Sequence, residues 1–526
     1  MSLNETFFRA AGSAAVSWLG VPGSRAIFFG LTAMLTLAIT VVFALSMTEW
    51  TPFTVVTMPL VALNAAWISG GAATAIIGLL RPLPNTVAIP ENWVPEGQTA
   101  ILVTLCKEEP HALSRYLKDL HASLGRAGLA DRTSIFVLSD TSGTEPVAQE
   151  QEALRDLVAE GILQYRRRTE NVGRKPGNIA DWLRQFSDSF DYMLVLDADS
   201  RMSAGRIRRM IRQIEHRPRT GLLQAGMALV PGQTRFGRHQ RVAVRLMSSN
   251  FGHGMAAWAG QSSNYWGHNA IIRVEAFRTA AELPSLPGRA PFGGPLLSHD
   301  FIEAAWIRKA GWAIELDPDL AGSAEDGPQT LEEFHKRDRR WCQGNLQHLF
   351  VLGKSGLHPM SRFHLASGVV SYLTAPIWLI LVILIASGTA PVTGALPFTL
   401  IVSVLLVPKL CALAGRITRD RTMRRKLVTI RAWTSELAIS TLIAPITMIR
   451  QTASVGSVLI GRDCGWKSGG TPRWSIPCGA PEAAAGLTIM LIAALSESGA
   501  TLWLAPLILP LLGAPLIVRA LDARPT

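Results

Sequence analysis

The stretch Phe190-Asp191-Tyr192-Met193-Leu194-Val195-Leu196-Asp197-Ala198-Asp199-Ser200 ends an apolar run with two carboxylates. A short apolar run of this kind is typical of a β-strand, in which alternate side chains point to the same side. Asp197 and Asp199 would then lie together beyond the strand end, where both can reach one divalent cation and one sugar nucleotide. Because a D-x-D pattern also occurs by chance in many loops, its neighbours must show whether it marks a functional site.

The composition is typical of a membrane protein that carries a soluble insert. The 526 residues are 48% hydrophobic and 17% charged, which allows two or more domains and argues against a disordered chain. The net charge of +12 fits Lys- and Arg-rich cytoplasmic loops, and without a basic stripe that contains aromatic residues we expect no nucleic-acid partner. The five cysteines include no Cys-x-x-Cys spacing, which argues against a disulfide framework or a zinc site.

Long apolar runs lie on both sides of a charged central region. Since about 20 apolar residues cross a bilayer, the sequence predicts six membrane spans, at residues 26–47, 54–80, 363–387, 394–414, 483–494 and 500–518. The first run is long enough to span, so we expect an anchor rather than a signal peptide. The run 436–449 is interrupted by Pro445 and ended by Arg450. It would either span or lie at the interface, which leaves seven or eight spans open.

The charges predict how the chain is oriented in the membrane. Residues 416–431 are strongly basic, and the positive-inside rule predicts that they lie in the cytoplasm. Two crossings separate them from the charged central region, which is therefore predicted to be cytoplasmic as well. The predicted order is a short cytosolic N-terminus (1–24), a transmembrane hairpin (25–82), a cytosolic α/β domain (87–356), a second hairpin (357–415), a basic interfacial region (416–478) and a closing hairpin (479–526).

Two further predicted strands of the central region also end in acidic residues. Residues 100–105 are followed by Glu108, and residues 134–138 are followed by Asp140. A helix-like pattern of leucines separates the two strands. Strand, helix and strand with acids at the carboxyl ends is the arrangement of an open α/β nucleotide site. Asp140 alone could equally be a turn residue or a helix cap.

Basic and aromatic residues accompany these acids. Lys175 lies between two glycines, where it can neutralise a phosphate that approaches the backbone closely. Arg340 can bind phosphate with two hydrogen bonds, and Trp341 offers a flat face to a sugar. The alternatives are a solvated basic turn for the first segment and an amphipathic interfacial helix for the second.

Asp300 has two interpretations. It precedes a helix-like stretch, with Glu303 three residues further on, as in a helix capping box. The functional alternative is a general base that removes a proton from a sugar hydroxyl.

The ordered motifs resemble the processive glycosyltransferases of family 2, and in particular the glucans biosynthesis glucosyltransferase H family of Gram-negative bacteria. The longest shared motif is Lys336-Arg-Asp-Arg-Arg-Trp-Cys-Gln-Gly-Asn-Leu-Gln-His348. The others are Asp140, Lys175-Pro-Gly-Asn178, Asp197-Ala-Asp199, Gly267-His-Asn-Ala-Ile-Ile-Arg273 and Ser298-His-Asp-Phe301.

The resemblance implies a membrane enzyme with an α/β GT-A glycosyltransferase domain inserted between transmembrane helices. It implies UDP-glucose as donor, Mg²⁺ or Mn²⁺ as cofactor, and a growing glucan as acceptor. The implied product is the β-1,2-linked backbone of osmoregulated periplasmic glucans, made at the bacterial inner membrane by a cytoplasmic catalytic domain. A periplasmic glucan-processing protein and acyl carrier protein are further implied partners.

The resemblance also implies a role for individual residues. Glu108 and Asp140 would contact the uridine, and Lys175 and Asp197 would hold the donor. Asp199 would bind the metal, and Arg340 would face the pyrophosphate. The acceptor sugar would stack on Trp341, and Asp300 would deprotonate the acceptor hydroxyl. Trp466 and Lys467 occupy a place similar to that of the gating loop of cellulose synthases, so Lys467 is also expected to contact the donor.

Two departures from the cellulose synthases leave other functions open. Arg337 stands where those enzymes carry Gln in Q-x-x-R-W, and His299 stands where they carry Glu in T-E-D. Cellulose is therefore not the expected product, but a chitin-, hyaluronan- or mannan-type synthase is an alternative. A non-catalytic membrane scaffold with a degenerate transferase domain is another. A transporter is disfavoured because no span carries paired charges.

Overall fold

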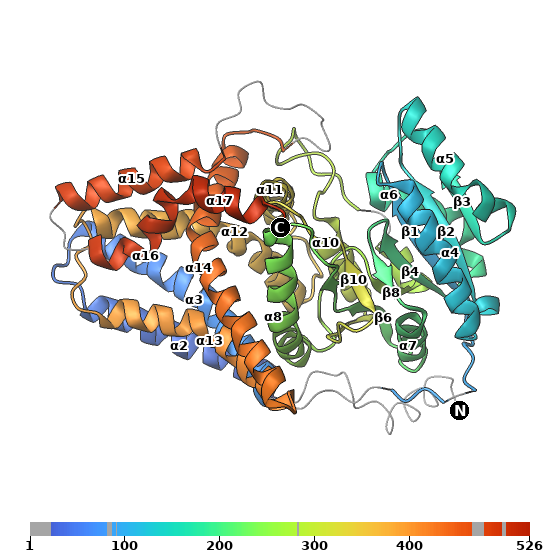
Figure 1. Ribbon diagram of the computed structural model, residues 1–526, viewed down its shortest axis with the longest axis horizontal. Helices are drawn as coiled ribbons and strands as arrows, with labels where there is room; N and C mark the ends of the chain where they lie inside the picture. The colour runs from blue at the N-terminus through green and yellow to red at the C-terminus, as the bar shows by residue number, and fades with distance from the viewer. Residues whose placement is uncertain are drawn as a thin grey trace.

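The protein consists of a bundle of long apolar helices beside an α/β domain (Figure 1). The computed structural model describes residues 23–81, 87–90, 92–280, 283–464, 478–496 and 501–525. The α/β domain follows the first two apolar helices in the chain, and the remaining apolar helices follow the domain. The order agrees with a domain inserted between groups of apolar helices.

A mixed sheet forms the centre of the α/β domain. The described residues give seven strands in the order β3-β2-β1-β4-β8-β6-β9. Strands β1, β2, β3 and β4 are parallel to one another, whereas β8 is antiparallel to both β4 and β6. The bounds are β1 Thr99–Leu105, β2 Thr133–Ser139, β3 Leu163–Arg167, β4 Tyr192–Asp197, β6 Thr220–Ala225, β8 Ala270–Arg273 and β9 Ala313–Asp317.

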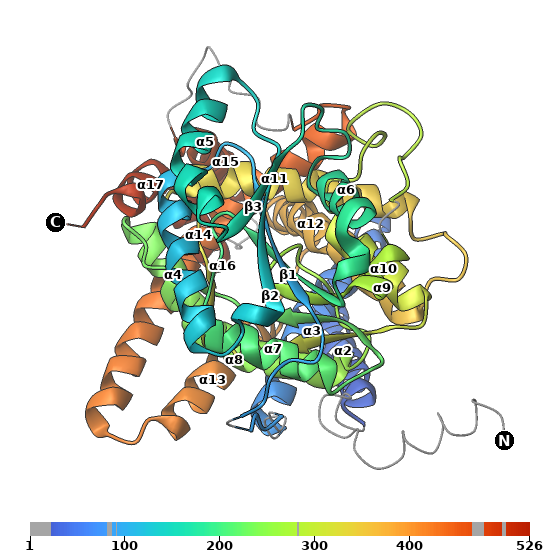
Figure 2. The same ribbon diagram turned by 90° about the vertical axis from the view of Figure 1, so that its right-hand side faces the viewer.

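Helices cover both faces of this sheet, as Figure 2 shows for α4 and α5 on one side and α6, α9 and α10 on the other. Successive strand residues point to opposite faces, so Ile101 and Val103 pack under one layer while Leu102 packs under the other. The helices are α4 Pro110–Arg126, α5 Thr144–Ala159, α6 Arg174–Phe186, α7 Ala204–Glu215, α9 Val274–Arg278 and α10 His299–Lys309.

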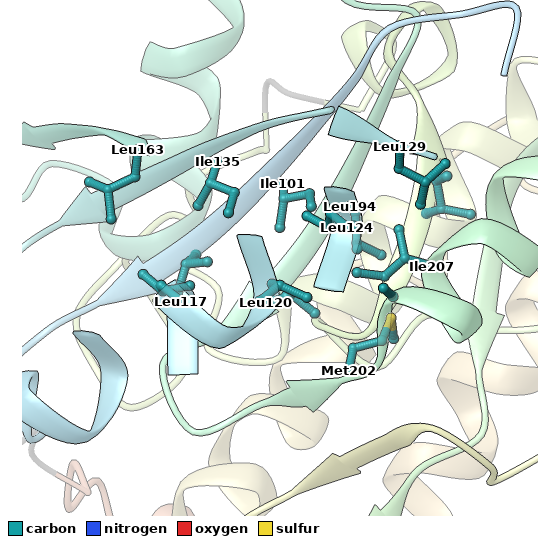
Figure 3. Packing of buried hydrophobic residues seen from close by; sticks show 14 of the residues in the cluster. Ile101, Leu117, Leu120, Leu124, Leu129, Ile135, Leu163, Leu194, Met202 and Ile207 are labelled. Atoms are coloured by element: carbon teal, nitrogen blue, oxygen red, sulfur yellow. The ribbon is translucent and has the colours of Figure 1, made fainter. Parts of the chain in front are cut away.

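The packing of α4 follows from its leucine spacing. Leu117, Leu120 and Leu124 recur at intervals of three and four residues, which places them on one face of a helix. Figure 3 shows them beside Ile101 and Ile135 of the neighbouring strands. Burial of each leucine contributes about 1.5–3 kcal/mol, so this contact fixes α4 against β1 and β2.

A small sheet and two long helices lie between the main sheet and the apolar bundle. The three short strands are ordered β5-β10-β7. Helix α8 contacts α3 and α13, and α11 contacts α12 and α14, so both link the α/β domain to the bundle. The bounds are β5 Arg201–Met202, β7 Ala228–Leu229, β10 Ser323–Glu325, α8 Arg235–Ala259 and α11 Leu331–Gln347.

Several helices are long and apolar enough to cross a membrane. Among the described residues these are α2 Ser24–Leu45, α3 Pro52–Leu80, α12 Pro359–Ala386, α13 Leu396–Arg419 and α14 Met423–Leu459. Helices α16 Thr501–Leu512 and α17 Ala514–Asp522 pass the same test as a pair bent by 53°, and α15 Ala480–Leu495 is apolar but shorter. The structure therefore offers five spans of sufficient length, or six if the bent pair is one span.

Helix α14 differs from the sequence prediction. Pro445 and Arg450 were expected to interrupt and end the apolar run, but the helix continues through both over 37 residues. A proline removes one backbone hydrogen bond, a loss that packing against other helices can offset. Pro445 is buried, and α14 contacts α8, α11, α12, α13 and α16. Figure 1 shows α14 inclined across the other apolar helices.

Candidate active site

The acids that follow three neighbouring parallel strands meet at one edge of the sheet. Thr104 of β1 pairs with Asp197 of β4, and Leu105 pairs with Ser139 directly before Asp140. Glu108 follows β1 and accepts a hydrogen bond from the backbone N–H of Cys106. A cavity of about 480 Å³ opens here, lined by Glu108, Asp140, Asp197, Asp199, Lys175 and Arg340 among others.

Asp140 is held by a bidentate ion pair. Arg168 donates to its two carboxylate oxygens at 2.8 and 2.9 Å, and Asn178 donates at 2.9 Å. Arg168 also donates to the carbonyls of Val172 at 3.0 Å and Arg174 at 2.9 Å. Asp140 and Arg168 therefore fix the first turn of α6, which carries Lys175. No role was predicted for Arg168, which ends the run Arg166-Arg167-Arg168.

Asp197 is the most strongly stabilised carboxylate of the site. Lys175 forms an ion pair with its Oδ1, and the Thr104 hydroxyl donates to the same oxygen at 3.0 Å. Burial alone would raise its pKa, but the positive charges of Lys175 and His268 hold the pKa of Asp197 well below its usual range. The side chain is therefore a permanent anion at neutral pH.

Asp199 has the opposite electrostatic surroundings. Burial and the negative charges of Asp197 and Glu325 raise the pKa of Asp199 to about 6. None of the described residues donates a hydrogen bond to this carboxylate. Oxygen ligands with surplus negative charge suit a divalent cation. Among the described residues no group of three His, Cys, Asp or Glu side chains could hold such a cation alone. A cation at Asp199 would therefore complete its coordination shell with substrate phosphates.

His268 connects the aspartates to β10. Its Nε2 lies 3.3 Å from the Glu325 carboxylate, and its Nδ1 lies 3.1 Å from the Asn269 side-chain oxygen. Burial would lower its pKa, but the charges of Asp197 and Glu325 raise the pKa of His268 to about 9. The imidazolium is therefore a fixed cation. His268 belongs to the motif Gly267-His-Asn-Ala-Ile-Ile-Arg273, from which no role was predicted for it, and Glu325 belongs to no motif that could have revealed it.

Asp300 lies in the first turn of α10, but it is not the helix cap. Ser298 occupies the N-cap position, so the capping interpretation of Asp300 is wrong. Burial raises the pKa of the Asp300 carboxylate, and the charge of His299 and the nearby backbone N–H groups offset this effect only in part. A raised pKa suits a carboxylate that takes up a proton during a reaction. Gly267 lies next to it, since a Cβ there would lie 3.5 Å from Oδ2.

Asp300 lines a second cavity of about 780 Å³. It extends past Trp341, which is 43% exposed, to Trp67 of α3 and Tyr372 of α12. The two cavities share six lining residues, namely Lys175, Asp197, Asp199, Leu297, His299 and Arg340. The strand-end cavity is called the donor cavity below, and the cavity with Asp300 and Trp341 the acceptor cavity.

Backbone strain is concentrated around the same site. The non-glycine residues with positive φ in the described part of the chain are Lys107 at 70°, Arg174 at 51° and Asn269 at 50°. Lys107 and Arg174 line the donor cavity, and Asn269 follows His268. Such conformations cost about 1–3 kcal/mol each and persist where the surrounding contacts fix a functional loop.

The structure gathers almost all predicted site residues into these two cavities. Glu108 and Asp140 line the donor cavity alone, while Asp300 and Trp341 line the acceptor cavity alone. Lys467, together with Trp466, lies outside the described residues.

The mixed sheet, the strand-end acids and two family matches define the class of the protein. The chain matches the Glycosyl transferase family 2 over residues 101–280 and the Glycosyl transferase family group 2 over residues 192–413. It is a hexosyltransferase of glycosyltransferase family 2 with a GT-A-like α/β fold. A solved mannosyltransferase of Pyrobaculum calidifontis, in complex with GDP-Man and Mn²⁺, is 13% identical, with a TM-score of 0.48 over 77% of this chain and 99% of that one.

Curated relatives identify the family more narrowly. The glucans biosynthesis glucosyltransferase H of Xanthomonas euvesicatoria is 39% identical over 76% of this chain and 68% of the relative. That of Xanthomonas campestris is 37% identical over 88% of this chain and 78% of the relative, and that of Vibrio cholerae is 37% identical over 79% and 62%. The chain belongs to the glucans biosynthesis glucosyltransferase H family.

Proposed function

We propose that this chain polymerises glucose from UDP-glucose into the β-1,2-linked backbone of osmoregulated periplasmic glucans. The observation that carries the proposal is the junction of the two cavities at Asp197, Asp199, Lys175 and Arg340. A nucleotide sugar in the donor cavity would place its diphosphate at this junction and its glucose toward Asp300. An acceptor sugar on Trp341 would then approach from the other side.

The reaction is an inverting transfer. Asp300 takes the proton from the acceptor hydroxyl, which attacks the anomeric carbon from the face opposite the diphosphate. A general base of this kind contributes about 10²–10⁴-fold to the rate. Lys175 and Arg340 stabilise the negative charge that develops on the leaving diphosphate.

The surroundings of Asp199 fit a divalent cation. Its carboxylate carries surplus negative charge and accepts no hydrogen bond from the described residues. Mg²⁺ or Mn²⁺ bound there would neutralise charge on the leaving diphosphate. Asp197 is already paired with Lys175, so it would orient that lysine toward the donor rather than share the metal.

We infer that the catalytic domain is cytoplasmic and that the chain lies in the bacterial inner membrane. If α14 lies at the interface, the crossings are α2, α3, α12, α13, α15 and the bent pair α16–α17, which equals the six spans predicted. The inclination of α14 across the other helices supports this arrangement (Figure 1). The acceptor cavity reaches α3 and α12, which supports export of the glucan between these helices. The family resemblance also suggests a periplasmic glucan-processing protein and acyl carrier protein as partners.

Linkage analysis of the product tests the proposal. Purified protein in detergent is given labelled UDP-glucose and Mg²⁺, and both UDP release and the methylated sugars of the product are measured. The proposal expects UDP release with 1,2-linked glucose, and no such product from the Asp300→Asn variant. Preferential turnover of UDP-N-acetylglucosamine or GDP-mannose, or a different glucose linkage, would contradict it.

A further inference from the structure

Arg337 lies directly over the predicted acceptor platform. Its guanidinium carbon is 4.6 Å from the centre of the Trp341 ring. Arg337 and Trp341 are four residues apart on α11, a spacing at which side chains of a helix stack on one another. Both line the acceptor cavity together with Asp300.

An ion pair holds Arg337 in this position. Its Nη2 lies 3.3 Å from the Glu325 carboxylate, which is itself 3.3 Å from Nε2 of His268. Glu325 ends β10, and the Asn269 side chain donates to Ser323 of the same strand at 2.9 Å. The guanidinium is therefore tied to a rigid part of the domain.

The stacked guanidinium leaves one face of the Trp341 ring for a sugar. A pyranose that rests on a flat ring can still rotate about the stacking axis, and each rotation presents another hydroxyl to the base. Arg337 has planar, directional N–H donors, and the pair with Glu325 does not use all of them. A hydrogen bond from one of these donors to a sugar hydroxyl would select a single rotation.

We propose that Arg337, held by Glu325, orients the acceptor sugar on Trp341 and so determines which hydroxyl faces Asp300. The inference rests on the proposed glucosyl transfer, whose acceptor it specifies further. Arg337 acts here as a positioning residue through contacts with Trp341 and the acceptor. A glutamine at this position could neither form an ion pair with Glu325 nor place a cation over the ring.

The test compares Arg337→Gln with Arg337→Lys in the full-length protein. Lysine keeps the charge opposite Glu325 but loses the planar donor group, so its effect should be intermediate. Lys336→Gln is the matched control, because Lys336 is the exposed neighbour on the same helix and pairs only weakly with Glu332 at 3.9 Å. The measured quantities are the Kd of UDP-glucose, the KM of added sophorose and cellobiose, and the linkage of the product.

Arg337→Gln should leave the Kd of UDP-glucose within about twofold while the KM of sophorose rises about tenfold and its advantage over cellobiose disappears. The product should contain mixed linkages, and Lys336→Gln should match the wild type. An unchanged acceptor KM and linkage in both Arg337 variants would overturn the proposal. The proposed function fails separately if the wild type releases no UDP from UDP-glucose. The Arg337 variants are then compared using the nucleotide sugar that the wild type does turn over.

Discussion

The donor and acceptor cavities are built in different ways. The donor cavity lies at the ends of β1, β2 and β4, and two of its carboxylates are paired within the domain, Asp140 with Arg168 and Asp197 with Lys175. The acceptor cavity lies between the domain and helices α3, α8 and α12. The donor half is thus rigid before substrate binds, whereas the acceptor half depends on how domain and bundle are packed.

This difference predicts two kinds of variant. A change in the donor half should disturb binding of the nucleotide sugar and the stability of the domain together. A change in the acceptor half should affect acceptor kinetics while the donor still binds. Asp300 lies in the acceptor cavity but acts on the reacting hydroxyl, so it should separate binding from chemistry most completely.

The largest expected effect is that of Asp300→Asn. Asparagine keeps the size of the side chain but cannot accept the acceptor proton, so UDP release should fall by about 10²–10⁴-fold. Calorimetric binding of UDP-glucose should persist, because Asp300 does not line the donor cavity. Asp188→Asn, which alters an exposed carboxylate, is the control. UDP release within tenfold of the wild type would exclude Asp300 as the base.

The second effect tests the rigidity of the donor half. Arg168→Ala leaves the carbonyls of Val172 and Arg174 without this donor, and it leaves the Asp140 carboxylate with the hydrogen bond from Asn178 but without its ion pair. We expect a loss of about 2 kcal/mol in the free energy of unfolding and a rise of 10- to 100-fold in the KM of UDP-glucose. Thermal unfolding in detergent and initial-rate kinetics measure the two quantities.

Arg167→Ala is the matched control for this change. Arg167 is exposed, and its side chain donates a long hydrogen bond of 3.4 Å to the backbone oxygen of Arg168. Its removal should change neither quantity. Equal effects of the two substitutions would mean that the Asp140 ion pair does not hold the first turn of α6, which carries Lys175.

The third effect concerns pH. Because the pKa of Asp199 is raised to about 6, its carboxylate stays protonated below that pH and becomes charged above it. If Asp199 binds the cation, kcat/KM for UDP-glucose should fall about tenfold for each pH unit below 6. A higher Mg²⁺ concentration should shift this acidic limb of the pH profile to lower pH, since the cation and the proton compete for one carboxylate. A limb that Mg²⁺ does not move would assign the titration to another group, such as Asp300.

The sequence predicted the donor half better than the acceptor half. Acids at the carboxyl ends of neighbouring parallel strands must lie together. The strand patterns alone therefore predicted that Asp140 and Asp197 lie at the same edge of the sheet. For Asp300 and Trp341 the residues alone left a structural and a functional interpretation open, because α10 and α11 reach the site through tertiary packing. Glu325 lies on a three-residue strand with no recognisable pattern, and only the fold brings it to His268.

The helix boundaries show the same limit. The apolar runs predicted α2, α3, α12 and α13 within a few residues, since a span is determined by its own composition. Helix α14 was expected to be short, because Pro445 and Arg450 usually end an apolar helix. Its continuation depends on contacts with α8, α11 and α12, which are remote in the chain. Local sequence could not supply that information.

The smallest expected effect lies where the acceptor cavity meets the bundle. The Tyr372 hydroxyl of α12 donates to Asp338 of α11 at 3.1 Å, and Gln451 of α14 donates to the other oxygen at 3.2 Å. Asp338 is only 6% exposed, so water cannot easily replace a lost partner. Tyr372→Phe should therefore lower the free energy of unfolding by about 1 kcal/mol.

The same substitution should also alter acceptor kinetics, because Asp338 and Trp341 share helix α11 and Tyr372 lines the acceptor cavity. We expect the KM of sophorose to rise severalfold while the KM of UDP-glucose stays constant. Tyr165→Phe, which removes a hydrogen bond of 2.9 Å to Glu150 outside both cavities, should cost similar stability without changing either KM. If Tyr372→Phe instead changed the two KM values equally, the donor and acceptor halves would be coupled through α11, and their separation would hold for the geometry of the site but not for its energetics.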